Sequence, residues 1–257
     1  MVIAPAKSTQ HWYDRAGNPR HGATLREARK EGLLVSVSTV LKCWPADSLK
    51  QWLDGQLILA AATTPRLPNE TDEAFVERVR VYAGEESKAA ADVGTRRHEL
   101  VERWLNGDRQ FLKDDETAFP PDPDIPYIQP YLRWYEDNVE RTLAAEQVIV
   151  NPKLGYAGKL DSKFLLRDGR TAVADLKNRK RTAVYATDAA QLSGYNEVAQ
   201  ADTTISIILG TTEPSILVKE WTPEERAEAW ENFLLCLEIW KRSKAYWPER
   251  VKPMEAT

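Results

Sequence analysis

Residues 155–177 read GYAGKLDSKFLLRDGRTAVADLK. On either side of Arg167-Asp168-Gly169, aliphatic and β-branched residues are interleaved with polar ones, which is typical of two half-buried strands joined by a tight turn. The pattern predicts a β-hairpin that carries Asp161 on its first strand and Asp175 and Lys177 on its second. We expect this hairpin to lie at the centre of the fold.

The length of the turn determines which way the two aspartates point. A two-residue loop at 168–169 places Asp161 and Asp175 on opposite faces of the sheet, because side chains alternate along a strand. A three-residue loop with Gly169 in the left-handed conformation places them opposite each other and brings Lys177 to the same face. Residues that face each other across two strands have Cβ atoms about 5 Å apart, and like charges there repel each other. We therefore expect the three-residue turn and a divalent cation; an ordinary solvated hairpin is the alternative.

Other polar residues accompany the hairpin. Glu146 lies on the apolar run before it. Gln191 and Tyr195 are one turn apart on the predicted helix after it, and His98 and Glu102 are one turn apart on an earlier predicted helix. These residues favour a functional site over a solvated surface.

Four short motifs occur in the chain in this order: GTRRHELVE at 94–102, GKLD at 158–161, DLK at 175–177 and QLSGY at 191–195. Together they resemble the PD-(D/E)XK nuclease superfamily, in particular its RecB-like exonuclease branch, which includes phage exonucleases and the mitochondrial genome maintenance exonuclease. The motifs cover about residues 94 to 200, and each is short. The resemblance implies a restriction-endonuclease-like core.

The order of the predicted elements agrees with that core. Helices come first, then the strand 144–150 and the hairpin, a helix, the strands 203–210 and 215–221, and a long helix. This order predicts an α/β sandwich with a central mixed sheet flanked by helices, plus N-terminal helical additions. We expect residues 1–84 to be an arm and helical region packed on a core of residues 85–257, as one continuous domain.

The acids and the lysine suit metal-dependent hydrolysis of a phosphodiester. Asp161 and Asp175 are expected to bind Mg²⁺ or Mn²⁺, because carboxylate oxygens suit these cations. The resemblance adds the backbone carbonyl of Leu176 and the side chain of His98 as ligands, and it implies that Lys177 orients the attacking water. A histidine packed in the core and a lysine in a surface ion pair are the alternatives.

Further residues are predicted around this centre. Glu102 or Glu146 would help to hold a second ion, if there is one. Gln191 and Tyr195 would reach the substrate backbone or steady the lysine and the water. Basic side chains that could bind phosphate are Arg96, Arg97, Arg179, Lys180 and Arg181.

The composition limits the classes of protein. The chain has 257 residues, a net charge of −4 and only two cysteines. It has neither a membrane-length apolar run nor a signal-peptide pattern. Cys43 and Cys236 provide no disulfide framework, and they exclude the four-cysteine iron–sulfur cluster that some members of the resembled family carry. We expect a protein of the cytoplasm, in a bacterial or phage-infected cell.

The predicted function is a metal-dependent DNA exonuclease acting on single-stranded or frayed ends, in DNA recombination, repair or processing. A structure-specific endonuclease and a catalytically inactive nucleic-acid-binding subunit are the alternatives. Asp161, Asp175 and Lys177 are all present, which favours the enzyme. A small-molecule hydrolase has less support, because the chain has no G-x-S-x-G motif and no glycine-rich phosphate loop.

Overall fold

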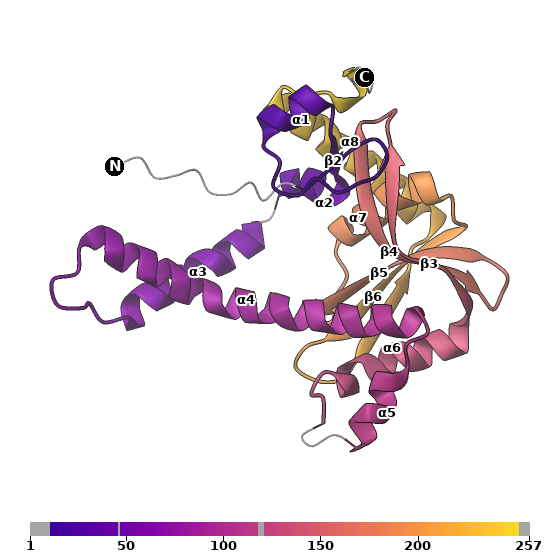
Figure 1. Ribbon diagram of the computed structural model, residues 1–257, viewed down its shortest axis with the longest axis horizontal. Coiled ribbons are helices and arrows are strands. Elements are labelled where there is room, and N and C mark those ends of the chain that lie inside the picture. The colour runs from indigo at the N-terminus through magenta and orange to yellow at the C-terminus, as the bar shows by residue number, and fades with distance from the viewer. Residues whose placement is uncertain (1–10, 46, 118–120, 252–257) are drawn as a thin grey trace. The chain divides into compact units, whose positions relative to one another are not determined.

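The computed structural model describes residues 11–45, 47–117 and 121–251 (Figure 1). The chain divides into two units: residues 1–44 together with 101–257 form the first, and residues 45–100 form the second. The boundary expected near residue 84 falls within helix α4 (Asp72–Leu105). No helix among the described residues is both long enough and apolar enough to cross a membrane.

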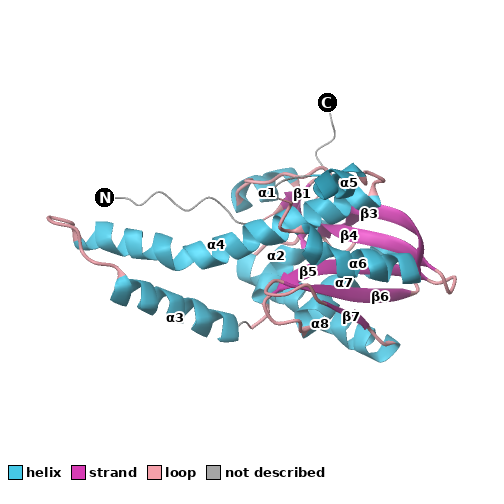
Figure 2. Ribbon diagram, turned by 90° about the horizontal axis from the view of Figure 1, so that it is seen from below, coloured by secondary structure: helices cyan, strands magenta, loops and turns pink. Residues whose placement is uncertain are grey.

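The first unit is built on a mixed sheet that has seven strands in the described part of the chain. The strands follow the spatial order β1-β2-β4-β5-β6-β7, and β3 pairs with β4 (Figure 2). The predicted α/β core with a central mixed sheet is confirmed. The strands are β1 (Trp12–Tyr13), β2 (Leu34–Ser36), β3 (Val139–Asn151), β4 (Tyr156–Leu166), β5 (Thr171–Arg179), β6 (Thr203–Gly210) and β7 (Ile216–Glu220).

Helices cover both faces of this sheet (Figure 1). Thr204 of β6 lines a pocket with Ser193 of α7, whereas its neighbour Ile205 lines another pocket with Trp134 of α6. Because neighbouring residues of a strand point to opposite faces, α6 and α7 lie on opposite sides. The helices of this unit are α1 (Leu25–Glu31), α2 (Val37–Val40), α5 (Gln110–Thr117), α6 (Ile125–Asn138), α7 (Ala186–Ala199) and α8 (Pro223–Lys244), with short 3-10 helices at Leu41–Cys43 and Pro248–Arg250.

The β4–β5 hairpin has the predicted three-residue turn. Leu166 N–H donates to the Arg170 carbonyl at 2.8 Å, and Gly169 has a φ of +88°. The ladder continues with Lys163 opposite Val173, which is the register that aligns the two aspartates. The turn is short and its glycine is left-handed, so the sequence was sufficient to predict it.

Strand β4 has different neighbours at its two ends. Along one edge it pairs with β3 over its whole length. Along the other edge, Tyr156 and Ala157 pair with β2, and residues 162–165 pair with β5. Strands β4 and β5 therefore separate at residue 161, and Asp161 lies at this fork.

The N-terminal residues contribute strands that the sequence did not predict. A capping box of Thr24 and Glu27 begins α1, and the left-handed Gly32 ends it. However, β1 and β2 flank this helix and belong to the sheet, and Trp12 and Leu34 are fully buried. Strands of two or three residues are too short to show a period in the sequence.

The acidic, proline-rich segment 113–127 is partly helical. Helix α5 extends through Thr117 and α6 begins at Ile125; residues 118–120 lie outside the described part. The side chain of Asp108 accepts a hydrogen bond from Gln110 N–H at 3.1 Å, which satisfies a donor in the first turn of α5. Helix formation therefore reaches further into this segment than its prolines suggested.

The second unit contains α3 (Asp47–Thr63) and α4 as far as Leu100. Helix α4 is continuous through Gly84. Trp52, Leu53 and Leu57 of α3 are at least 40% exposed.

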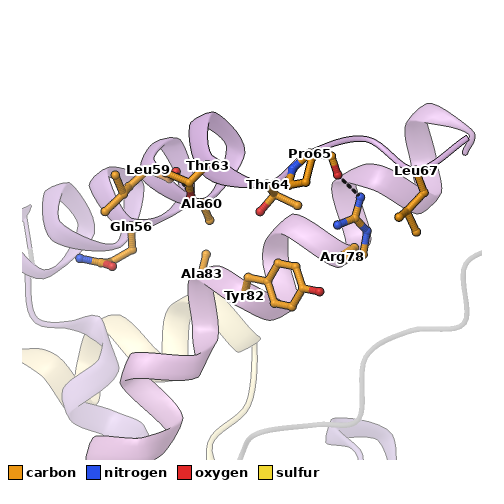
Figure 3. A pocket seen from close by; sticks show the side chains of 10 residues that line it. All are labelled: Gln56, Leu59, Ala60, Thr63, Thr64, Pro65, Leu67, Arg78, Tyr82 and Ala83. Carbon is orange, nitrogen blue, oxygen red and sulfur yellow. Dashed lines mark hydrogen bonds between the residues drawn. The ribbon is translucent and has the colours of Figure 1, made fainter.

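A pocket of about 590 Å³ lies within this second unit (Figure 3). Arg78 closes one part of it by donating to the Pro65 carbonyl at 2.8 Å. None of the residues predicted for the functional site lines it; the lining residues are Gln56, Leu59, Ala60, Thr63, Thr64, Pro65, Leu67, Arg78, Tyr82 and Ala83.

Candidate functional site

Three acids lie in a row across the middle of the sheet. The β3–β4 register places Glu146 opposite Asp161, and the β4–β5 register leads to Asp175 on the other side of Asp161. At the fork, Asp161 Oδ2 accepts a hydrogen bond from Leu176 N–H at 2.9 Å, so its side chain bridges the two strands where the ladder ends. The hairpin thus brings the two predicted aspartates together, and β3 adds Glu146.

Glu146 and Asp161 bring two carboxylates close together. Their carboxylates each have an oxygen within 4.8 Å of the other. Glu146 has a φ of +51°, a conformation that costs a non-glycine residue about 1–2 kcal/mol. Burial raises the pKa of Asp161, and the charge of Glu146 raises it further against the opposing effect of Lys177. The protein therefore holds two carboxylates together against both strain and repulsion.

Lys159 is the basic neighbour of this pair. It forms an ion pair with Glu146, whose hydrogen bond is the main factor that raises the pKa of Lys159. The charge of Glu102 raises the same pKa, so Glu102 lies within electrostatic range of Lys159. The part of Glu102 in holding a second ion stays a prediction.

Asp175 and Lys177 form an ion pair on β5. Asp175 is fully buried, and the Lys177 ammonium lies 2.9 and 2.8 Å from its two oxygens. Burial alone would lower the pKa of Lys177, but the charges of Asp175 and Asp161 outweigh this effect and raise it. Lys177 is therefore an ammonium at neutral pH, and it is still 28% exposed.

Helix α7 supplies two more of the predicted residues. Gln191 Nε2 donates to Asp175 Oδ1 at 2.8 Å and to the Tyr195 hydroxyl at 3.1 Å. Tyr195 is buried, and burial, together with the Asp175 and Asp161 charges, raises its pKa well above the usual value. Tyr195 is therefore a neutral phenol that fixes the Gln191 amide beside Asp175.

Gly158 has a role that was not assigned from the sequence. A Cβ on this residue would lie 2.7 Å from Cε1 of Tyr195, closer than such atoms approach. The glycine of the GKLD motif therefore makes room for the ring that positions Gln191. The signal in the sequence was a glycine inside a predicted strand, which often marks a close approach of another group.

Arg179 has a partner within the protein. Its guanidinium forms two hydrogen bonds to Asp188, Nη1 to Oδ2 at 2.7 Å and Nη2 to Oδ1 at 2.6 Å. Asp188, a buried residue in the first turn of α7, was not singled out from the sequence. Lys180 and Arg181 are exposed in the loop that follows β5.

Three of the predicted residues belong to helix α4. His98, Arg96 and Arg97 belong to the second unit, where Arg97 is buried, Arg96 is exposed and His98 is half-buried. The part of His98 in a metal site stays a prediction, as does that of the Leu176 carbonyl.

The donor set fits a hard divalent cation. An ion with metal–oxygen distances of about 2.0–2.1 Å can touch two oxygens up to about 4.2 Å apart. Glu146 and Asp161 therefore need to close by less than about 1 Å to share one ion, given oxygens within 4.8 Å of each other. The residues present suit Mg²⁺ or Mn²⁺.

Comparisons with known proteins do not identify a family for this chain. No known protein family matches the chain, and no curated protein matches it. A solved protein designated SSO0001 is similar over 73% of this chain and 85% of its own, at 12% identity and a TM-score of 0.34. This likeness is too slight to support an argument.

Proposed function

We propose that this chain is a metal-dependent nuclease that hydrolyses phosphodiester bonds of DNA, with single-stranded or frayed ends as its substrate. The observation that supports the proposal is the grouping of Glu146, Asp161 and Asp175 in one row, with the partly exposed ammonium of Lys177 beside it. The activity is expected in the cytoplasm of a bacterial or phage-infected cell.

The acids would bind the cation, and the cation would act on the phosphate and the water. Glu146 and Asp161 would hold Mg²⁺ or Mn²⁺, with Asp175, the Leu176 carbonyl and His98 as the further predicted ligands. When bound, the cation polarises the phosphate and lowers the pKa of a bound water. The repulsion between the clustered carboxylates gives the site its affinity for positive charge.

Lys177 would supply a positive charge and hydrogen bonds to the reacting groups. Because its pKa is raised, the side chain holds its proton at neutral pH and cannot take one from water. Its ammonium can donate to Asp175 and also to a phosphate oxygen or to the attacking water. Gln191, fixed by Tyr195, keeps Asp175 in the orientation that this contact requires.

The proposal is tested by incubating the protein with end-labelled linear DNA and with closed circular DNA. Each substrate is tested with Mg²⁺, with Mn²⁺ and with EDTA. We expect shortening of the linear DNA that needs the cation, and no cleavage of the circle. Cleavage of the circle would favour the endonuclease, and binding without any cleavage would favour the inactive subunit.

Two lysine variants show whether the cleavage belongs to this site. Lys177→Ala should lower the rate at least about 100-fold, the usual cost of removing one charge-stabilising donor. Lys153→Ala, at an exposed position in the β3–β4 turn, is the matched control and should cleave like the wild type. Equal rates for both variants would refute the proposed role of Lys177.

A further inference from the structure

Tyr185 is an exposed ring close to the candidate site. It is the last residue before α7 and is 51% exposed, more than any other tyrosine, tryptophan or phenylalanine among the described residues of the first unit. The other tyrosines of that unit for which burial is described are buried or half-buried.

The Tyr185 ring packs against the guanidinium of Arg179. The guanidinium carbon of Arg179 lies 4.5 Å from the centre of the Tyr185 ring. Arg179 is itself fixed by its two hydrogen bonds to Asp188 and by a third to the Ala183 carbonyl at 2.6 Å. Asp188 also accepts from Tyr185 N–H at 2.8 Å. The ring and its backbone are therefore ordered before any ligand binds.

The ring also lies near the reacting groups. Arg179 is two residues after Lys177 on β5, so both side chains point to the same face, about 7 Å apart along the strand. The loop between Arg179 and Tyr185 carries the exposed Lys180 and Arg181. A strand whose phosphate reached Lys177 would pass this loop and its aromatic end.

We propose that Tyr185, supported by the Arg179–Asp188 pair, is a platform on which a base of single-stranded DNA stacks next to the phosphate that is cleaved. Every base has a flat face, so such stacking is tolerant of sequence. Bases inside a duplex are already stacked on both sides, so the platform favours single strands and frayed ends. This inference rests on the proposed function for the identity of the neighbouring site.

The test measures binding of a fluorescent oligothymidine in EDTA, where the predicted metal-dependent hydrolysis is prevented. Tyr185→Ala should weaken binding about 5- to 150-fold, the range that loss of one stacked base gives. Tyr185→Phe keeps the ring and should bind like the wild type. Tyr185→Leu keeps the bulk without an aromatic face and should bind like Tyr185→Ala. An abasic strand of the same length should bind all four proteins equally. Thermal unfolding of each variant reports on its folding.

The outcomes separate this inference from the proposed function. If the wild type cleaves DNA and Tyr185→Ala binds as the wild type does, the platform is refuted and the nuclease stands. If no DNA is cleaved but oligothymidine binding depends on the ring, the nuclease is refuted and the platform stands. The platform would be overturned if Tyr185→Ala lost as much affinity for the abasic strand as for oligothymidine. It would also be overturned if the wild type did not bind single strands.

Discussion

Replacing Asp161 by asparagine should change stability in opposite directions with and without a metal. The carboxylates of Asp161 and Glu146 have oxygens within 4.8 Å of each other. Two unit charges at that distance repel by about 3.5 kcal/mol at an effective dielectric constant of 20. Lys177 and Lys159 offset part of this repulsion, but the pKa of Asp161 is still raised, so the charge is disfavoured overall.

Asparagine removes this charge and keeps the shape. Its carbonyl oxygen can still accept the hydrogen bond from Leu176 N–H, now made at 2.9 Å to Asp161 Oδ2. Without metal, we therefore expect Asp161→Asn to be more stable than the wild type, by about 1–3 kcal/mol.

With metal the order should reverse. A cation at 100 times its dissociation constant stabilises the folded wild type by about 2.7 kcal/mol. In a unit of about 200 residues each kcal/mol raises Tm by about 2–4 °C, so the expected rise is about 5–11 °C. Asp161→Asn lacks one of the predicted charged ligands and should show little or none of this rise.

Thermal unfolding followed by tryptophan fluorescence, in EDTA and across a titration of MgCl₂ or MnCl₂, measures both effects. Glu228→Gln, which removes an exposed acid from α8, is the matched control and should shift with metal as the wild type does. A wild type whose Tm is unmoved by either cation would refute the metal site. An Asp161→Asn protein less stable than the wild type in EDTA would refute the argument from repulsion.

Three further predictions concern single residues. Gly158→Ala should lower the free energy of unfolding by about 1–3 kcal/mol and slow any cleavage, because the new methyl group would lie 2.7 Å from the Tyr195 ring. Urea unfolding measures this loss, and an unchanged free energy of unfolding would contradict the close packing. Arg78 lowers the pKa of Glu70 to about 2 from an ordinary 4.5, so its stabilising effect is complete above pH 4.5 and is lost as pH falls toward 2. Glu70→Gln should therefore lose less stability in acid than the wild type does. If the stability of the two proteins depends on pH in the same way, this ion pair does not stabilise the fold. Gly169→Ala should cost about 1–2 kcal/mol because φ is +88°, and Gly169→Asn should cost less in the same unfolding assay.

The hairpin was predictable because its information is local. The three-residue turn needs one left-handed residue, and Gly169 supplies it. Once the turn is set, alternation along the strands places Asp161, Asp175 and Lys177 without further knowledge of the fold. The capping box of Thr24 and Glu27 was predictable for the same reason.

Other features depend on segments that are distant in sequence. At the fork at residue 161, β5 stops pairing with one edge of β4. Strand β2, from far earlier in the chain, pairs with the other end of that edge. Neither β2 nor its two-residue partner β1 is long enough to show a hydrophobic period. The Arg179–Asp188 pair requires the end of β5 to meet the first turn of α7, which no spacing rule predicts.

The sequence by itself determined the α/β class, the turn of the central hairpin and the face on which its two aspartates and lysine lie. These follow from backbone preferences of a few neighbouring residues. Only the tertiary structure decided that Glu146 adopts a left-handed conformation beside Asp161, that Gly158 makes room for Tyr195, and that Arg179 is held by Asp188 beneath an exposed ring. Each of these depends on how separate elements pack, because a side chain's partners are set by the whole fold while its backbone preference is set by its neighbours.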